Sequence, residues 1–236
     1  MRNNETIESH GNNLVIKSIF ISFCSVFLIG ISYLVSVNII SILINYFSDI
    51  NVITLKAEES INSILYLMGI LCFIIVVPTI YMMFRRSYVD ALYIKEVKML
   101  NKFPLLYCLS LIGCFFGAFV SIKIMIPFMI KYNNILGIAN TITLHNLIKI
   151  IVLNSLTFFI IFHIPFFIKT LVSFDLVSID FLKSKRKIIF FISMFLGAVF
   201  SPTELFTMFI ISIPIYLSYE IGILISKSKK KINGVI

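Results

Sequence analysis

The sequence predicts an all-α membrane protein with six transmembrane helices, and three observations carry this prediction. Hydrophobic residues make up 59% of the 236 residues and charged residues only 13%, an apolar excess that a soluble core cannot bury. The apolar residues gather in six runs that reach, or nearly reach, the roughly 20 residues needed to cross a bilayer as a helix. Basic residues gather on one side of these runs, which predicts an N-in, C-in orientation.

The expected spans lie near residues 17–37, 63–84, 103–127, 147–168, 188–200 and 203–225. The fifth span has 13 residues and covers about 20 Å, so we expect it to cross where the bilayer is thin. Apolar spacings of three and four within 38–62 predict short amphipathic helices on the outer face. The Asn-rich segment 131–145 is expected to be an irregular outer cap. The whole chain, 1–236, reads as one integral membrane domain.

Charge sets the predicted orientation. Sixteen of the 20 lysines and arginines lie on the predicted inner side, and the outer side keeps Lys56, Lys123, Lys131 and Lys149. The net charge of +9 therefore indicates orientation and an affinity for anionic membrane lipids. Because the basic residues are spread over short segments, we expect no nucleic-acid partner.

Cofactor chemistry lacks a sequence signal. The cysteines form no CxxC pair and the histidines are far apart, so we expect neither a metal site nor any cofactor. Glycine-rich phosphate-binding motifs and the GxSxG motif do not occur, so we expect no enzyme activity and no catalytic residue. The cysteines are Cys24, Cys72, Cys108 and Cys114, and the histidines are His10, His145 and His163.

The last expected span is the most informative stretch, because it places Glu204, Glu220, Pro202 and Pro214 within apolar sequence. An ionisable side chain in hydrocarbon costs several kcal/mol unless it faces protein or water. Glu204 follows a Ser-Pro pair and suits the positive end of a helix. Pro214 removes one helical hydrogen bond. We therefore expect these polar residues to have a functional role within the membrane; the alternative is a packing kink with one acid that reaches the interface.

The order of these residues resembles a known signature. Ser201-Pro202-Thr203-Glu204, then Pro214, then Glu220-Ile221-Gly222 is similar to (S/T)PxDxxxQxxxxxPxxxxxEIG in the last helix of the TatC family, the multispanning core of the twin-arginine protein translocase. Glu204 replaces the usual Asp, and Met208 replaces the usual Gln.

Other stretches resemble the same family. Pro78 and Tyr81, followed by Ala91-Leu92-Tyr93 and Glu96, are similar to APxxxYQxWxFxxPALYxxER; the alternative for Glu96 is an ordinary partner of a basic neighbour. Gly117 and Pro127 match the family's GxxxxxxxxxP. The stretch ending in His163-Ile164-Pro165 resembles FGxxFExP, with His163 in place of the family's intramembrane Glu.

The first helix departs most from the family, which opens it with HLxELRxRL. Here Asn13 replaces the acid that, with the loop Glu, binds the paired arginines of signal peptides. By resemblance Glu96 takes the loop role, and Glu8 is the nearby acid that can reach the same place. This loss of motif residues favours a mitochondrion-encoded member in the inner membrane. The amino-acid composition, rich in Phe, Ile, Leu, Lys and Asn, fits an A+T-rich genome and favours the same origin. A plastid thylakoid or a bacterial plasma membrane is the alternative.

The resemblance implies a concave, glove-like fold that binds twin-arginine signal peptides and moves folded proteins with the proton-motive force. It implies single-span TatA- or TatB-like partners at Glu204 and the last helix, self-association, and passengers such as the Rieske iron-sulfur protein. Equal depth suggests that His163 pairs with Glu220; the alternative is that His163 donates to a carbonyl freed by Pro165. Two other functions remain open: a small-solute or proton-coupled transporter, and a structural subunit of a respiratory complex.

Overall fold

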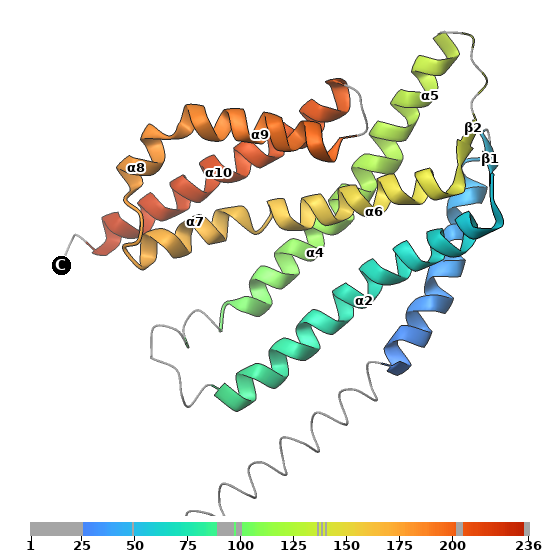
Figure 1. Ribbon diagram of the computed structural model, residues 1–236. Coiled ribbons are helices and arrows are strands. Elements are labelled where there is room, and N and C mark those ends of the chain that lie inside the picture. The colour runs from blue at the N-terminus through green and yellow to red at the C-terminus, as the bar shows by residue number, and fades with distance from the viewer. Residues whose placement is uncertain are drawn as a thin grey trace, which may run out of the picture. The chain divides into compact units, whose positions relative to one another are not determined.

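The computed structural model describes residues 26–48, 50–88, 97, 101–135, 137, 139, 141–201 and 205–233. These residues are mostly helical (Figure 1). They divide into two compact units. Unit 1 comprises residues 1–100 and 141–148, and unit 2 comprises residues 101–140 and 149–236. Five helical stretches are long and apolar enough to cross a membrane: Val26–Tyr46, Ala57–Tyr81, Phe103–Ile135, Leu144–Ser173 and Leu205–Lys227.

Unit 1 holds the N-terminal helix Val26–Tyr46, strand β1 (Asn51–Ile53), helix α2 (Ala57–Tyr88) and strand β2 (Thr141–Thr143). Glu59 fixes the start of α2, because its Oε2 accepts a hydrogen bond from the Leu55 N–H at 3.1 Å. Helix α2 then runs through Pro78 without a break.

Two predictions about the connecting segments were wrong. Residues 38–46 continue the first helix instead of forming separate amphipathic helices, because no Gly or Pro interrupts the apolar spacing. Segment 131–145 is not irregular throughout: Thr141–Thr143 forms β2 and pairs in parallel with β1, with Val52 opposite Ile142. Local residue patterns did not reveal this pair, since its strands have three residues each and lie far apart in sequence.

Unit 2 begins with a continuous rod of helix α4 (Phe103–Val120), the π-helical turn η2 (Ser121–Met125) and helix α5 (Ile126–Ile135). Pro127 lies directly after the wide turn. A proline ring clashes with the carbonyl four residues earlier in an α-helix, and a π turn relieves that clash. The Ile126 N–H accordingly donates to the Ser121 carbonyl, five residues back.

The remaining elements are α6 (Leu144–Ile161), whose first residues belong to unit 1, and in unit 2 α7 (Ile164–Ser173), α8 (Ile179–Ser184), α9 (Arg186–Phe200) and α10 (Leu205–Asn233). The predicted fourth helix is divided into α6 and α7, because Pro165 lies in the first turn of a new helix and has no N–H to continue the old one. Helix α10 continues through Pro214. Helix α9 has 15 residues, so the sixth crossing remains a prediction.

Two apolar clusters hold unit 2 together. The first joins α4, η2, α6 and α10 around the fully buried Phe158 and Met125. The second joins α7, α8 and α10 around Ile168, Leu182 and Ile223. Helix α10 contributes to both clusters, and Figure 1 shows it alongside α7 and α9.

Candidate functional site

The predicted acid Glu220 lies at the point where α10 meets α7, α8 and α9, and three residues close together in sequence each hold a different helix. The Tyr219 hydroxyl donates to the Leu182 carbonyl at the end of α8 at 2.7 Å. Glu220 Oε2 accepts from Arg186 Nη2 at the start of α9 at 2.7 Å. Gly222 faces α7, where an added Cβ would lie 2.8 Å from Ile168. We call Tyr219, Glu220 and Gly222 the α10 hub.

The Glu220 carboxylate is held on both oxygens. Oε1 accepts from the Tyr216 hydroxyl at 3.1 Å, one helical turn earlier, while Oε2 takes the guanidinium. The Glu220 side chain is 22% exposed and the Arg186 side chain 43%, so the pair is only partly removed from solvent. Arg186 Nε is buried and finds no partner among the residues that the structure describes. The Arg186 and Glu220 side chains are therefore joined by one charge-assisted hydrogen bond, from Nη2 to Oε2.

Helices α9 and α10 pack antiparallel, through contacts that lie about one turn apart. Arg186 pairs with Glu220, and four residues further along α9 the Phe190 ring meets Tyr216 edge-on at 5.5 Å, four residues back along α10. Beyond them the two helices also approach closely at Gly197, where an added Cβ would lie 2.7 Å from the Met208 carbonyl oxygen. These contacts thus advance along α9 as they go back along α10.

His163 lies in the break between α6 and α7. Its Nδ1 lies 3.0 Å from the Phe159 carbonyl oxygen, which can only accept, so Nδ1 carries a hydrogen in this contact. Ser110 Oγ of α4 lies 2.7 Å from Nδ1 and 3.1 Å from Nε2. The Phe159 carbonyl is available because the His163 N–H bonds to Ile160 instead, as the helix ends ahead of Pro165.

The predicted pairing of His163 with Glu220 was therefore wrong. The α10 face that meets α7 is the one that carries Gly222. Glu220, two residues earlier, points about 200° round the helix, toward α9. There the carboxylate meets the Arg186 guanidinium in a charge-assisted hydrogen bond. The alternative was that His163 donates to a carbonyl freed by Pro165, which would be the Ile161 carbonyl four residues earlier. The contact is instead with the Phe159 carbonyl, so this alternative holds only in that His163 bonds to the backbone of its own helix.

A second buried polar group lies between α4, η2 and α6, and the sequence analysis missed it. Asn154 is 1% exposed, and its Nδ2 lies 3.0 Å from Ser121 Oγ and 3.1 Å from Met125 Sδ. Gly117 lets the helices approach, because an added Cβ would lie 2.7 Å from the Asn154 carbonyl oxygen. The missed signal is Gly113-x-x-x-Gly117, the small-residue spacing of closely packed membrane helices.

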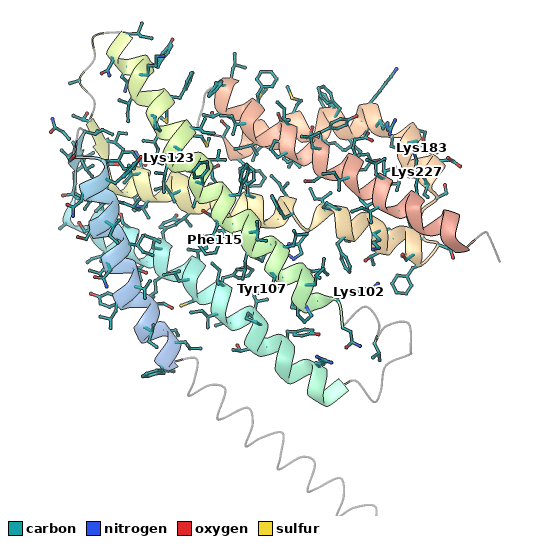
Figure 2. All side chains as sticks on the ribbon, turned by 180° about the vertical axis from the view of Figure 1, so that it is seen from behind. Lys102, Tyr107, Phe115, Lys123, Lys183 and Lys227 are labelled. Carbon is teal, nitrogen blue, oxygen red and sulfur yellow. The ribbon has the colours of Figure 1, made fainter. Side chains whose placement is uncertain are left out.

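The exposed side of α4 differs from this packed side. Phe115 is 72% exposed, and Tyr107 and Lys123 mark two further positions along the same rod (Figure 2). On the surface of α8, Lys183 pairs with Asp180 at 2.8 Å.

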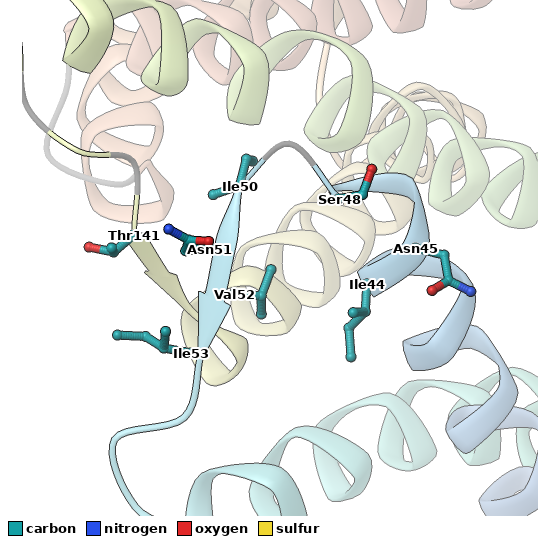
Figure 3. Close-up of a pocket in the computed structure, with 8 residues that line it drawn as sticks. All are labelled: Ile44, Asn45, Ser48, Ile50, Asn51, Val52, Ile53 and Thr141. Atoms are coloured by element: carbon teal, nitrogen blue, oxygen red, sulfur yellow. The ribbon is translucent and has the colours of Figure 1, made fainter.

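Unit 1 contains an open cavity of about 530 Å³ beside β1 (Figure 3). It lies between the strand and the end of the first helix, with neutral polar and aliphatic lining. The lining residues are Ile44, Asn45, Ser48, Ile50, Asn51, Val52, Ile53 and Thr141. Nothing in the sequence analysis pointed to this cavity.

The other predicted site residues have mixed outcomes. Pro78 and Pro214 lie inside α2 and α10, while Pro127 and Pro165 lie in the first turns of α5 and α7. Four residues lie outside the described part of the chain: Glu8, Glu96, Pro202 and Glu204. Within the described part, no group of three or more His, Cys, Asp and Glu that can hold a metal ion occurs.

Comparison with known proteins gives a consistent result. A family model described as Sec-independent protein translocase protein (TatC) matches residues 9–214. The TatC protein of Blattabacterium from Periplaneta americana is 33% identical over 129 residues, 52% of this chain and 47% of that protein. TatCy of Bacillus subtilis is 28% identical over 138 residues, 58% of this chain and 54% of that protein. The chain thus spans about half the length of the curated relatives it matches.

Solved structures show the same fold. A crystal structure of the twin arginine translocase receptor TatC matches with a TM-score of 0.66 and 23% identity, covering 92% of this chain and 98% of that one. The same receptor in DDM matches with a TM-score of 0.67, covering 92% and 99%. This chain belongs to the TatC family.

Proposed function

We propose that the chain is the multispanning subunit of a twin-arginine protein translocase. In this role it binds twin-arginine signal peptides and moves folded proteins across an energy-transducing membrane with the proton-motive force. The observation that carries the proposal is the family match over residues 9–214. Its action is binding and conveyance, with no bond made or broken in the passenger.

Signal recognition is proposed for Glu96, with Glu8 as its acidic neighbour. A carboxylate accepts a guanidinium through two parallel hydrogen bonds, and partial removal from water strengthens the pair. Two acids suit two adjacent arginines. Because Asn13 stands where the family has an acid, we expect weaker discrimination of Arg-Arg over Lys-Lys than in a member that keeps the acid.

Partners are proposed at Glu204 and along α10: single-span TatA- or TatB-like subunits, with further copies of this chain. The described part of α10 already binds α7, α8 and α9 on its packed sides. Its remaining face is apolar and exposed, which suits another helix or lipid. The exposed residues are Leu205, Phe209, Ile213, Leu217, Ile221 and Leu224. A Rieske iron-sulfur protein is the proposed passenger.

The membrane is proposed to be the mitochondrial inner membrane. The proposal rests on the altered motif at the first helix and on an amino-acid composition that fits an A+T-rich genome. The curated relatives named above are bacterial, which supports the bacterial plasma membrane as the second candidate. Both membranes carry the proton-motive force that the proposed function needs.

The rival function, a proton-coupled transporter with a His163–Glu220 relay, is not favoured. His163 contacts Ser110 and its own helix, whereas Glu220 is bound to Arg186 and Tyr216. A relay needs these two side chains to exchange a proton, and they have different partners. A structural subunit of a respiratory complex is not favoured by the family match either.

The test uses energised membrane vesicles that contain the chain with TatA- and TatB-like subunits. A folded reporter with an Arg-Arg signal should be protected from external protease only when the gradient is present. The reporter with a Lys-Lys signal should be transported less. Equal protection with and without a protonophore, or with a signal-free reporter, would contradict the proposal.

The binding site is tested separately with a fluorescent Arg-Arg signal peptide. Glu96→Gln should weaken binding by about 1–3 kcal/mol, the range for one charge-assisted hydrogen-bonded pair. Glu58→Gln is the matched control, because Glu58 is an exposed acid in the first turn of α2. If both variants bind like the unmodified chain, Glu96 has no part in recognition.

A further inference from the structure

The contact between Arg186 and Glu220 has a role beyond holding two helices together. The hydrophobic effect does not drive helices together within a membrane, because lipid tails are as apolar as the side chains, so close packing and polar contacts decide how two helices associate. A helix pair then needs specific contacts to fix how far one helix is slid along the other. Buried polar groups fix the register of packed helices in some proteins, a single buried Asn in a coiled coil being the best attested case.

We propose that the Arg186–Glu220 pair sets the register between α9 and α10, so that Arg186 is a positioning residue for this hairpin. A slip of one turn would place Arg186 opposite Tyr216 or Leu224 and leave the Glu220 carboxylate without a guanidinium. The same slip would separate the Phe190 and Tyr216 rings, which now meet at 5.5 Å. The ion pair and the ring contact therefore favour the same register.

The other contacts of α10 make the register matter for the rest of unit 2. The Tyr219 hydroxyl bonds to the Leu182 carbonyl of α8, and Gly222 fits against Ile168 of α7. If α10 slid by one turn, Gly222 would be exchanged for a residue with a side chain at a position where a Cβ would lie 2.8 Å from Ile168. Arg186 thus keeps α9 aligned with a helix that is itself fixed on two other sides.

The consequence for function rests on the proposed translocase role. The α9–α10 hairpin carries the residues proposed to bind single-span partners, and its surface is formed by side chains from both helices. Exposed Phe195 of α9 and exposed Phe209 of α10 keep a fixed spacing only while the register is fixed. Loss of the ion pair should therefore weaken partner capture by changing the spacing of these exposed side chains.

The test measures the distance between spin labels at Val199 and Lys227, in a chain whose native cysteines are replaced. Val199 is an exposed residue near the end of α9 and Lys227 an exposed residue near the other end of α10. Their separation is mainly axial, so a one-turn slip changes it by about 5 Å. Arg186→Glu and Glu220→Arg should each shift or broaden the distribution by this amount, and the double reversal should restore it.

Two further variants sharpen the test. Arg186→Lys should stay close to the unmodified distance, because the structure uses only one N–H of the guanidinium on Glu220. Asp180→Lys, which breaks the exposed pair with Lys183, should leave the distance unchanged. If a charge-reversed variant does not fold, as judged by melting in the same detergent, Arg186→Gln and Glu220→Gln replace it.

Single variants with the unmodified distance distribution, or a double reversal no closer to it than the singles, would overturn the proposal. Capture of TatA- and TatB-like subunits is measured on the same samples and should fall and recover with the distance. If the distance responds while the unmodified chain captures no partner and transports nothing, the register inference stands and the proposed function fails.

Discussion

At the scale of single residues, the chain uses its few membrane-embedded polar groups for helix packing. Glu220 holds α9, His163 bonds across to Ser110, and Asn154 bonds to Ser121. In hydrocarbon an unpaired polar atom is costly, so each such pair also selects one packing partner. Glycines complete the arrangement by letting backbones approach where a side chain would not fit.

Gly117 offers a direct test of this packing. In Gly117→Ala, the new Cβ would lie 2.7 Å from the Asn154 carbonyl oxygen and 2.9 Å from the Ser155 Cα. Both neighbours are backbone atoms that cannot rotate away, so we expect a loss of about 1–3 kcal/mol of unfolding free energy. Unfolding in detergent, followed by circular dichroism, measures this change.

The matched control is Gly69→Ala, where no heavy atom lies within 4 Å of the new Cβ. Alanine favours a helix over glycine by about 0.5–1 kcal/mol, so this variant should be as stable as the unmodified chain or slightly more so. Equal destabilisation by both substitutions would show that Gly117 is not a close-contact position.

At the scale of elements, prolines mark the places where the helices change. Pro127 follows the π turn, Pro165 begins α7, and Pro214 lies within an unbroken α10. The sequence could therefore locate the irregular points but not their outcome. A missing N–H allows a wide turn, a new helix or a tolerated gap, and the surrounding packing decides among them.

The β1–β2 pair provides an element-scale prediction. Cysteines at Val52 and Ile142, which face each other in the parallel register, should form a disulfide when oxidised in a chain without native cysteines. Val52→Cys with Thr143→Cys should not, since neighbouring residues of a strand point to opposite faces. Cross-linking is read as a mobility shift after cleavage between the strands. The reverse preference would place the strands one residue out of register.

At the scale of the whole molecule, composition and motif order were sufficient to predict a mostly helical membrane protein of the TatC family. The residues that tie elements together were not predictable, because they depend on contacts far apart in sequence. Arg186 is one of the sixteen basic residues counted only for orientation, and Tyr219 directly precedes the Glu220-Ile221-Gly222 motif, yet both hold other helices to α10. The β1–β2 pair was missed for the same reason.

Orientation is the whole-molecule prediction. The charge asymmetry predicts that both termini face the side of synthesis. A cysteine at Asn134 should react with a membrane-impermeant maleimide added from outside intact cells or organelles, and one at Ser228 should react only after the membrane is opened. Labelling of Ser228 alone from outside would reverse the orientation.

The parallel pairing of Val52 with Ile142 also constrains the order of biogenesis. Strand β1 leaves the ribosome about 90 residues before its partner, and the intervening chain contains α2 and the long α4–α5 rod. A nascent chain that stops short of β2 cannot close this pair, whatever its inserted helices have reached. The two strands therefore pair only after α5 has been synthesised. Their pairing cannot guide the insertion of the earlier helices.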